Sequence, residues 1–345
     1  MNQLPDELIT RIKRQNSHLN AMERSLSRAL LHSYPLMLQV EPTNRCNAAC
    51  PTCARNYYDK QANPPGDLPL DLIPYLEQAM VFAETVLFGG YGEPLMGKNF
   101  YALVEQARRM LCRIEVITNG RQVDEETARF FAETGVGRVT FSVDSGTDEG
   151  MKKARGITLT EILDRVALLL APDKHQPLVS FNMTLHRRNL DELPALVEIA
   201  AKHRVNDLFV AHQKIYTRDQ SDHSVLDDPD HARNVFDLAK QKAGEFGVNL
   251  LLPPLSGTVP CMQPFEMMMV DHSGRVQGCC SALFVGGEPK LSLGRIPDQK
   301  LLDLWNHRLM VSARQCALDG TSCPEPCMAC GFRVTEKHAH LRLLD

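Results

Sequence analysis

Hydrophobic residues from position 36 onward fall into short runs that alternate with longer stretches of helical spacing. Six runs have the length and apolar character of buried strands: 36–41, 85–88, 113–118, 138–143, 178–184 and 207–211. Between and after them, apolar residues recur three and four positions apart, which predicts helices at 70–83, 98–111, 124–134, 159–170, 190–204 and 230–246. Six strand–helix units in succession predict an α/β fold with a parallel sheet and right-handed crossovers.

The ends of these elements carry further signals. Thr158 and Glu161 have the spacing of a capping box, and Gly135 fits a left-handed helix cap. Because six units are fewer than the eight that close a full barrel, we predict an open, partial barrel over residues 36–252. Polar residues follow the predicted strands, at the edge where parallel α/β folds keep their chemistry: Glu41, 89–93, 118–120, 142–145, 182–184 and 212–213.

Residues 1–35 and 253–345 lie outside this alternation. Apolar residues at near-helical spacing predict that 1–35 is a charged helical leader. Two consecutive prolines open the C-terminal part, which holds seven of the eleven cysteines. There, 266–270 and 275–278 predict a β-hairpin and 299–310 predicts a helix. We therefore expect a small α+β domain over residues 253–345.

The composition narrows the classes of function. The chain has 345 residues, with 38 basic and 42 acidic side chains and a net charge of −4, so nucleic acid is disfavoured as the main partner. Its apolar runs are too short to span a bilayer, and its N-terminus lacks the features of a signal peptide. We therefore expect a cytoplasmic protein that does not bind membranes. Eleven cysteines are many for such a protein and odd in number, which favours metal binding over a disulfide framework.

Three cysteines, Cys46, Cys50 and Cys53, lie in the loop directly after the first predicted strand, with C-x3-C-x2-C spacing. Three thiolates on a short loop can hold three corners of an iron–sulfur cubane and leave its fourth iron open. Structural zinc is the alternative, although zinc sites more often have four ligands in paired C-x2-C motifs. The spacing alone leaves both open.

This loop and the ends of the next three strands together resemble the radical S-adenosylmethionine (SAM) enzymes. The matching segments are Cys46-Asn-Ala-Ala-Cys50-Pro-Thr-Cys53, Gly89-Gly-Tyr-Gly-Glu-Pro94, Thr118-Asn-Gly120 and Ser142-Val-Asp144. The resemblance covers most of residues 36–212. It implies a partial (β/α)6 radical SAM barrel in which Cys46, Cys50 and Cys53 bind a [4Fe–4S] cluster whose open iron binds SAM.

The same resemblance implies roles in binding SAM. Gly89, Gly90, Gly92 and Glu93 are expected to line its methionine amino group. Ser142 and Asp144 are expected at the ribose or the methionine end, and Asn182 at the ribose hydroxyls; a helix-capping turn is the alternative for Ser142 and Asp144. Lys152, Lys153 and Arg155 are candidates for the SAM carboxylate or for a solvated face.

A second set of cysteines lies in the C-terminal part. The spacing of Cys261 and Cys279, with Gly274 between them, and the later Cys327-x2-Cys330 resemble the SPASM or shorter twitch domain. This resemblance implies one auxiliary [4Fe–4S] cluster, and structural zinc is again the alternative. We assign it to Cys261, Cys279, Cys327 and Cys330, with Cys323 and Cys280 as alternative ligands.

Cys280 is also a candidate catalytic residue. It follows a predicted ligand directly, so in an extended segment its side chain points away from the cluster. A thiol there could donate a hydrogen atom to a substrate radical, as an epimerase requires. A buried spectator is the alternative.

The resemblance implies reductive cleavage of SAM to methionine and a 5′-deoxyadenosyl radical, with an external donor of the flavodoxin or ferredoxin type. We expect an oxidoreductase or epimerase that abstracts hydrogen from a small polar metabolite such as a sugar or aminocyclitol. The alternative is a maturase that modifies a ribosomally made peptide or a protein side chain. About 35 residues precede the first strand, too few for a separate peptide-recognition module, so that alternative needs recognition by another protein. The third hypothesis is a non-enzymatic iron–sulfur or zinc protein. The turn at 89–93 argues against it, because such a protein would not need a SAM-binding pocket.

Overall fold

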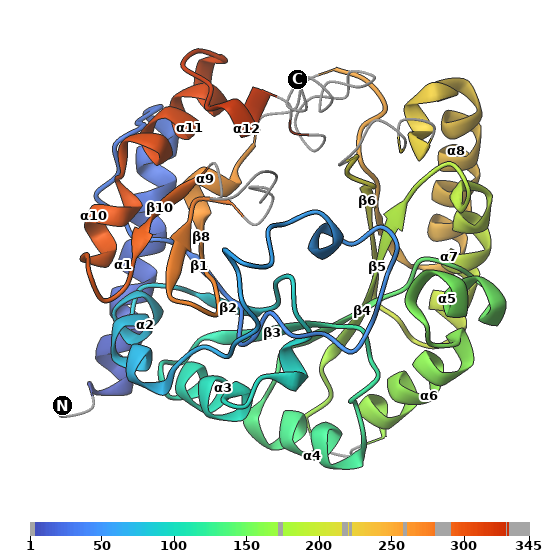
Figure 1. Cartoon of the computed structure of the whole chain (residues 1–345), viewed down its shortest axis with the longest axis horizontal. Helices are drawn as coiled ribbons and strands as arrows, with labels where there is room; N and C mark the ends of the chain where they lie inside the picture. The colour runs from blue at the N-terminus through green and yellow to red at the C-terminus, as the bar shows by residue number, and fades with distance from the viewer. Residues whose placement is uncertain are drawn as a thin grey trace. The chain divides into compact units, whose positions relative to one another are not determined.

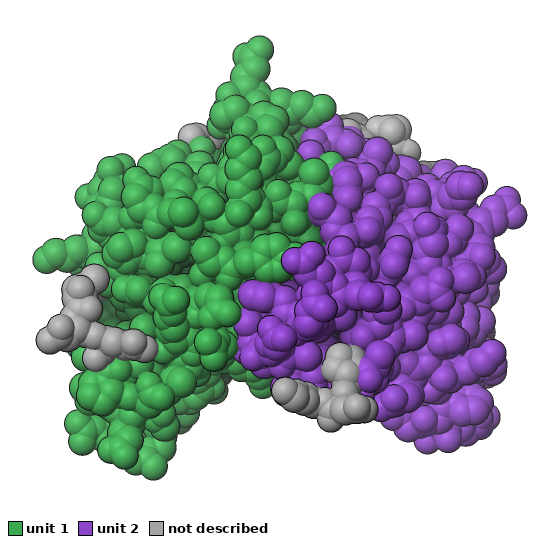
Figure 2. Space-filling model, turned by 90° about the horizontal axis from the view of Figure 1, so that it is seen from below, with its two compact units in different colours: residues 1–46, 58–116, 260–328 green, residues 47–57, 117–259, 329–345 purple. Residues whose placement is uncertain are grey.

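The computed structural model describes residues 4–171, 175–215, 220, 223–257, 261–279, 291–328 and 330. Two compact units make up the chain (Figure 2). Unit 1 comprises residues 1–46, 58–116 and 260–328, and unit 2 comprises 47–57, 117–259 and 329–345. The predicted domain boundaries at 35 and 252 divide the chain differently and remain a prediction. None of the helices within the described ranges has the length and apolar character needed to cross a membrane.

The sheet of unit 1 combines parallel and antiparallel strands. Strands β1 (Met37–Val40), β2 (Thr85–Phe88) and β3 (Arg113–Thr118) are parallel neighbours. On the other edge of β1, strand β8 (Met267–Val270) also pairs in parallel, with Met37 opposite Met267. The predicted hairpin therefore extends the sheet that carries the first cysteine loop.

Two further strands complete that edge. Strand β9 (Arg275–Gln277) runs antiparallel to β8, and β10 (Ser292–Arg295) runs antiparallel to β9. The apolar side chains of β8 are buried, so Met267, Met268 and Met269 are core residues, as the hairpin prediction requires.

The helices of unit 1 come from all three of its segments. They are α1 (Asp6–Ser25), α2 (Ile73–Met80), α3 (Phe100–Arg109), α9 (Gln263–Glu266), α10 (Leu301–Trp305), α11 (Arg308–Asp319) and α12 (Glu325–Met328). The prediction of a single helix at 299–310 is wrong, because α10 ends at Trp305 and a second helix, α11, begins at Arg308. His307 caps the start of α11, accepting a hydrogen bond from the Leu309 amide.

Helix α1 buries a face that its apolar pattern does not predict. Lys13, Asn16, Asn20 and Glu23 are buried, whereas Met22 is 47% exposed. The Lys13 ammonium donates to the Met80 carbonyl at 2.7 Å and lies 3.1 Å from the Cys112 sulfur. Burial lowers the pKa of Lys13 and outweighs its favourable partners. The leader is thus held by hydrogen bonds to the ends of other elements as well as by apolar contact.

Unit 2 contains four parallel strands, in the order β4 (Arg138–Ser142), β5 (Leu178–Leu185), β6 (Asp207–His212) and β7 (Asn249–Leu251). Figure 1 shows strands β4, β5 and β6 with the helices of this unit. These helices are α4 (Glu125–Thr134), α5 (Asp148–Arg155), α6 (Leu159–Leu170), α7 (Leu193–Lys202) and α8 (Pro229–Phe246).

The α/β class and the six predicted strands are confirmed. The capping box of Thr158 and Glu161 is formed, and Gly135 has the left-handed φ of 72° that ends α4. The sequence analysis missed α5 and β7. Strand β7 has three residues, which is too short to produce a recognisable pattern, and α5 is rich in charged residues.

Candidate functional site

The turn at residues 89–93 follows β2 in unit 1 and packs against the end of β1. The Gly89 carbonyl accepts a hydrogen bond from the Gln39 side chain at 2.9 Å, and the Glu93 amide donates to the Arg45 carbonyl at 2.8 Å. A Cβ atom on Gly92 would lie 2.0 Å from the Thr43 carbonyl oxygen. A side chain there would collide with backbone, so this close approach requires glycine.

Glu41, directly after β1, uses both carboxylate oxygens to join this turn to the hairpin of β8 and β9. Its side chain is 2% exposed. Oε1 accepts the Tyr91 amide at 2.6 Å and the Gly92 amide at 3.4 Å. Oε2 accepts from His272, whose amide lies at 3.3 Å and whose Nδ1 lies at 3.0 Å.

His272 has an acceptor beside each ring nitrogen, since its Nε2 lies 3.2 Å from the Pro64 carbonyl oxygen. Burial lowers the pKa of His272, but the hydrogen bond and charge of Glu41, with Asp271 and the Pro64 carbonyl, outweigh burial and raise it. Two acceptors suit the imidazolium form, which donates from both nitrogens.

The first cysteine set is divided between the units, with Cys46 in unit 1 and Cys50 and Cys53 in unit 2. None of the three is in a disulfide, and Cys50 is buried. Within unit 2 the Cys53 amide donates to the Cys50 carbonyl at 3.1 Å, which folds the loop into a turn. The Arg155 guanidinium lies 3.8 Å from the Cys50 sulfur. Cysteine binds metal as the thiolate, and a thiolate at this position would lie beside a positive charge.

The donor set therefore fits an iron–sulfur cluster in its chemistry. In the described part of the chain, no three His, Cys, Asp or Glu side chains form a group that could hold a metal ion. A cubane differs from a site for one ion, because each thiolate binds a different iron. The fit consequently rests on three thiol side chains outside disulfides and on the cation beside one of them.

Asp144 follows β4 and is paired with Arg155, at the end of α5. The guanidinium donates to its two carboxylate oxygens at 2.6 and 3.1 Å, and the Thr184 amide donates at 2.8 Å. Burial lowers the pKa of Arg155, but Asp144 and Cys50 outweigh it, so the pKa is raised and the guanidinium stays charged. Helix α5 is capped by Thr147, which excludes the helix-capping alternative for Ser142 and Asp144 at this helix. Of the three basic candidates, Arg155 makes this ion pair and Lys153 lines the cavity described below; a role at the SAM carboxylate remains a prediction for all three.

Ser142 and Asn182 lie opposite each other in the register of β4 and β5. Ser142 is buried and Asn182 is half-buried. Neither side chain makes a hydrogen bond within the described ranges, so both keep the polar groups that a ligand at the carboxyl end of the sheet would need. Their assignment to SAM remains a prediction.

A cavity of about 370 Å³, lined by both polar and apolar groups, lies in unit 2, beside the cysteine loop. Burial lowers the pKa of His186, whose ring centroid is 6.3 Å from that of His223. Gln213 is 7% exposed; its Nε2 lies 3.3 Å from the His223 Nδ1, and its buried Oε1 has no hydrogen-bond partner among the described residues. The lining of the cavity comes from the cysteine loop, α5 and the loops after β4, β5 and β6: Pro51, Thr52, Asp144, Ser145, Thr147, Glu149, Gly150, Lys153, Ala154, His186, Arg188, Asn189, Glu192, Gln213 and His223.

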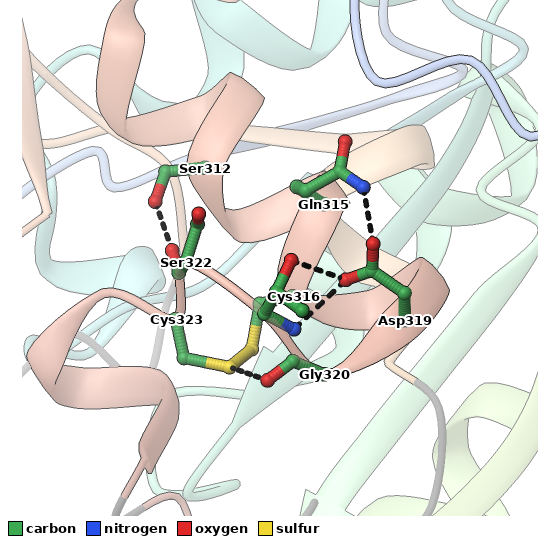
Figure 3. Close-up of a disulfide and its surroundings, with 8 residues drawn as sticks. Ser312, Gln315, Cys316, Asp319, Gly320, Ser322 and Cys323 are labelled. Carbon is green, nitrogen blue, oxygen red and sulfur yellow. Dashed lines mark hydrogen bonds between the residues drawn. A yellow bond between two sulfur atoms is a disulfide. The ribbon is translucent and has the colours of Figure 1, made fainter.

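In the second cysteine set, Cys261, Cys279 and Cys327 lie in unit 1 and Cys330 in unit 2, and none of them is in a disulfide. Cys323 is bonded to Cys316 (Figure 3), so the structure does not supply it as an alternative cluster ligand. The disulfide spans the C-terminal turn of α11. Cys280 lies outside the described residues, so its role as a ligand or hydrogen donor remains a prediction.

Comparison with known proteins gives two family matches. A model of the radical SAM superfamily matches residues 40–200, and a model of the SPASM iron–sulfur cluster-binding domain matches residues 261–331. The chain is 25% identical to the PqqA peptide cyclase of Gluconobacter oxydans over 313 residues, covering 87% of this chain and 84% of that protein. It is also 25% identical to a tungsten-containing aldehyde ferredoxin oxidoreductase cofactor-modifying protein of Pyrococcus furiosus, covering 78% and 80% of the two chains.

Solved structures show the same fold. Streptococcus suis SuiB bound to SAM superposes with a TM-score of 0.67 at 15% identity, covering 87% of this chain and 72% of that one. Native anSMEcpe with bound SAM gives a TM-score of 0.62 at 18% identity, with 79% and 81% coverage. These structures confirm the predicted fold class.

Proposed function

The chain belongs to the radical SAM superfamily and carries a C-terminal SPASM domain, and on that premise we propose that it modifies a peptide or a protein side chain. The two domains imply SAM and two [4Fe–4S] clusters as cofactors. When bound, the SAM-binding cluster would pass on the electron that cleaves SAM, and SAM would supply the 5′-deoxyadenosyl radical that abstracts hydrogen from a substrate. An external donor of the flavodoxin or ferredoxin type provides that electron in this proposal.

The observation that carries the proposal is the extent of the similarity to PqqA peptide cyclase. It covers 87% of this chain. SuiB, which shares the fold, is known in a complex with its precursor peptide SuiA. These relatives favour the peptide alternative over the sugar or aminocyclitol that the sequence analysis placed first.

Separate residues bind the cluster and SAM in this proposal. Cys46, Cys50 and Cys53 hold the SAM-binding cluster, and the turn at 89–93 receives the methionine end of SAM. Arg155 keeps a positive charge beside the Cys50 sulfur. Because a charged guanidinium in a buried site also attracts carboxylates, Arg155 can exchange part of its pairing with Asp144 for the SAM carboxylate.

We assign the cavity in unit 2 to a polar side chain of the substrate. Its volume of about 370 Å³ lies near the lower end of the range for small-molecule sites, so it suits a single side chain. His186, Gln213 and His223 line the cavity and offer polar partners to such a side chain. Cys261, Cys279, Cys327 and Cys330 remain the proposed ligands of the auxiliary cluster.

The test compares two classes of substrate. Anaerobically reconstituted protein is incubated with SAM and dithionite, either with short peptides encoded beside its gene or with a panel of sugars and aminocyclitols. We expect a mass change in one peptide that accompanies 5′-deoxyadenosine formation and is absent when Cys46, Cys50 and Cys53 are all replaced by Ala. Turnover of a sugar or aminocyclitol with none of the peptides changed would overturn the proposal.

A further inference from the structure

Three segments that are far apart in the sequence meet at the Glu41 carboxylate in unit 1. They are the end of β1, the turn at 89–93 and the turn of the hairpin at 271–274. His272, whose contact with Glu41 spans 231 residues of sequence, comes from the domain of the auxiliary cluster. The carboxylate therefore connects the proposed SAM turn to a domain that is not expected to touch SAM.

The hairpin turn that presents His272 is itself well fixed. Asp271 Oδ1 accepts hydrogen bonds from the Ser273 amide at 2.9 Å and the Arg275 amide at 3.0 Å. Gly274 has a φ of +80°, and a Cβ atom there would lie 2.8 Å from the Ile296 carbonyl oxygen. This turn can therefore hold the imidazole in one place.

The contact between Glu41 and the turn at 89–93 is equally restrictive. A Cβ atom on Gly90 would lie 2.5 Å from Glu41 Oε1, so the carboxylate lies directly against the backbone of the turn. A buried carboxylate that loses a partner is costly, which makes one position of Glu41 strongly preferred. Gln39 and Arg45 also hold the turn, but both act from the side of β1.

We propose that Glu41 and His272 are positioning residues that hold the turn at 89–93 in the conformation that receives the methionine amino group of SAM. SAM binding then depends on the β8–β9 hairpin of the C-terminal domain. The inference rests on the role that the proposed function gives to this turn. It assigns to the SPASM domain a part in SAM binding that is separate from holding its cluster.

The experiment uses the full chain with His272→Gln, Glu41→Gln and the double variant. The matched control is Glu23→Gln in the same unit. Glu23 is similarly buried, with 1% exposure, and accepts from the His32 amide at 2.7 Å and its Nδ1 at 3.1 Å, but it does not contact the turn. Iron content, the dissociation constant of SAM and amide hydrogen exchange of residues 89–93 are measured for each protein.

We expect SAM to bind about 10-fold more weakly to Glu41→Gln and a few-fold more weakly to His272→Gln, at unchanged iron content. Exchange of the Tyr91 amide should be faster in both. The double variant should lose less than the product of the two single effects, because both residues act through one contact. Glu23→Gln should lower the thermal midpoint and leave the SAM dissociation constant unchanged.

Three results would overturn the inference. One is an unchanged SAM dissociation constant in both variants, whether or not exchange of the turn becomes faster. Another is an equal loss of SAM binding in Glu23→Gln, which would indicate general destabilisation. If Glu41→Gln does not fold, His272→Gln decides alone, and normal SAM affinity there is the third. SAM binding needs no peptide, so failure to find a peptide substrate affects only the proposed function.

Discussion

Two buried carboxylates, Glu41 in unit 1 and Asp144 in unit 2, each follow a parallel strand but obtain their counter-charge differently. Asp144 is paired with Arg155, eleven residues further along the chain. Glu41 is paired with His272, 231 residues away, and with backbone amides. The first arrangement is local and permanently charged, whereas the second is long-range and titratable. The contrast shows that similar positions in one fold can differ in stability, pH response and predictability.

The largest expected effect breaks the local pair. Arg155→Met leaves Asp144 buried without its cation, and we expect the free energy of unfolding to fall by about 3–5 kcal/mol. Urea denaturation measures this loss. Lys152→Met, at an exposed position of the same helix, is the control and should change stability by less than about 0.5 kcal/mol. Equal effects of the two substitutions would show that the pair is not a stabilising unit.

The second prediction sharpens the comparison through pH. His272→Gln should reduce the free energy of unfolding by about 1–3 kcal/mol below pH 6. His272 has a pKa raised above its ordinary value of about 6.5, so its contribution is complete below that pH and is lost as pH rises through the folded-state pKa. Glu41 and Asp271 are the charged groups that face it.

Denaturation measured from about pH 5 to pH 9 should therefore show a shrinking difference in the free energy of unfolding between the unmodified protein and His272→Gln. The Arg155→Met difference should stay nearly constant, because arginine remains charged throughout this range. A His272→Gln difference that grows with pH would contradict the assignment of an imidazolium.

A third effect, no larger than the second, concerns the space around Glu41. Gly90→Ala places a Cβ atom 2.5 Å from Glu41 Oε1 and should cost about 1–3 kcal/mol. Gly244→Ala, within α8 and with no atom within 4 Å of the added carbon, should instead be neutral or stabilising by up to about 1 kcal/mol. Thermal midpoints compare the two. If Gly90→Ala is as harmless as the control, the turn does not depend on close contact with Glu41.

The smallest effect tests how much the Arg155 side chain depends on its second partner, the Thr184 hydroxyl. Thr184 donates its amide to Asp144 and accepts from Arg155 Nη2 through its hydroxyl at 3.3 Å. Thr184→Val removes only the hydroxyl, so we expect a loss of about 0.5–1.5 kcal/mol. A loss as large as that of Arg155→Met would mean that the hydroxyl, and not the ion pair, determines stability here.

The sequence predicts well the features that depend on residues close together in the chain. The positions of the six strands, to within one residue at each end, the capping box and the Gly135 cap depend on neighbouring residues, and they are confirmed. Arg155 could be proposed as one of three basic residues, but choosing it required the position of Cys50. The partners of Glu41 could not be predicted, because they depend on the pairing of β8 with β1. The buried polar face of α1 was missed for the same reason, since its partners lie on other elements.

The parallel pairing of β1 with β8 also has a consequence for synthesis. Met37 and Met267 are 230 residues apart, so one edge of β1 has no partner until the C-terminal hairpin leaves the ribosome. At ordinary translation rates that interval is about 10 to 50 s. An unpaired strand edge is a template for aggregation during this time. The nascent chain therefore carries its thiol-rich loop beside an incomplete sheet, and we expect its yield to depend on holding chaperones more than on the stability of the finished protein.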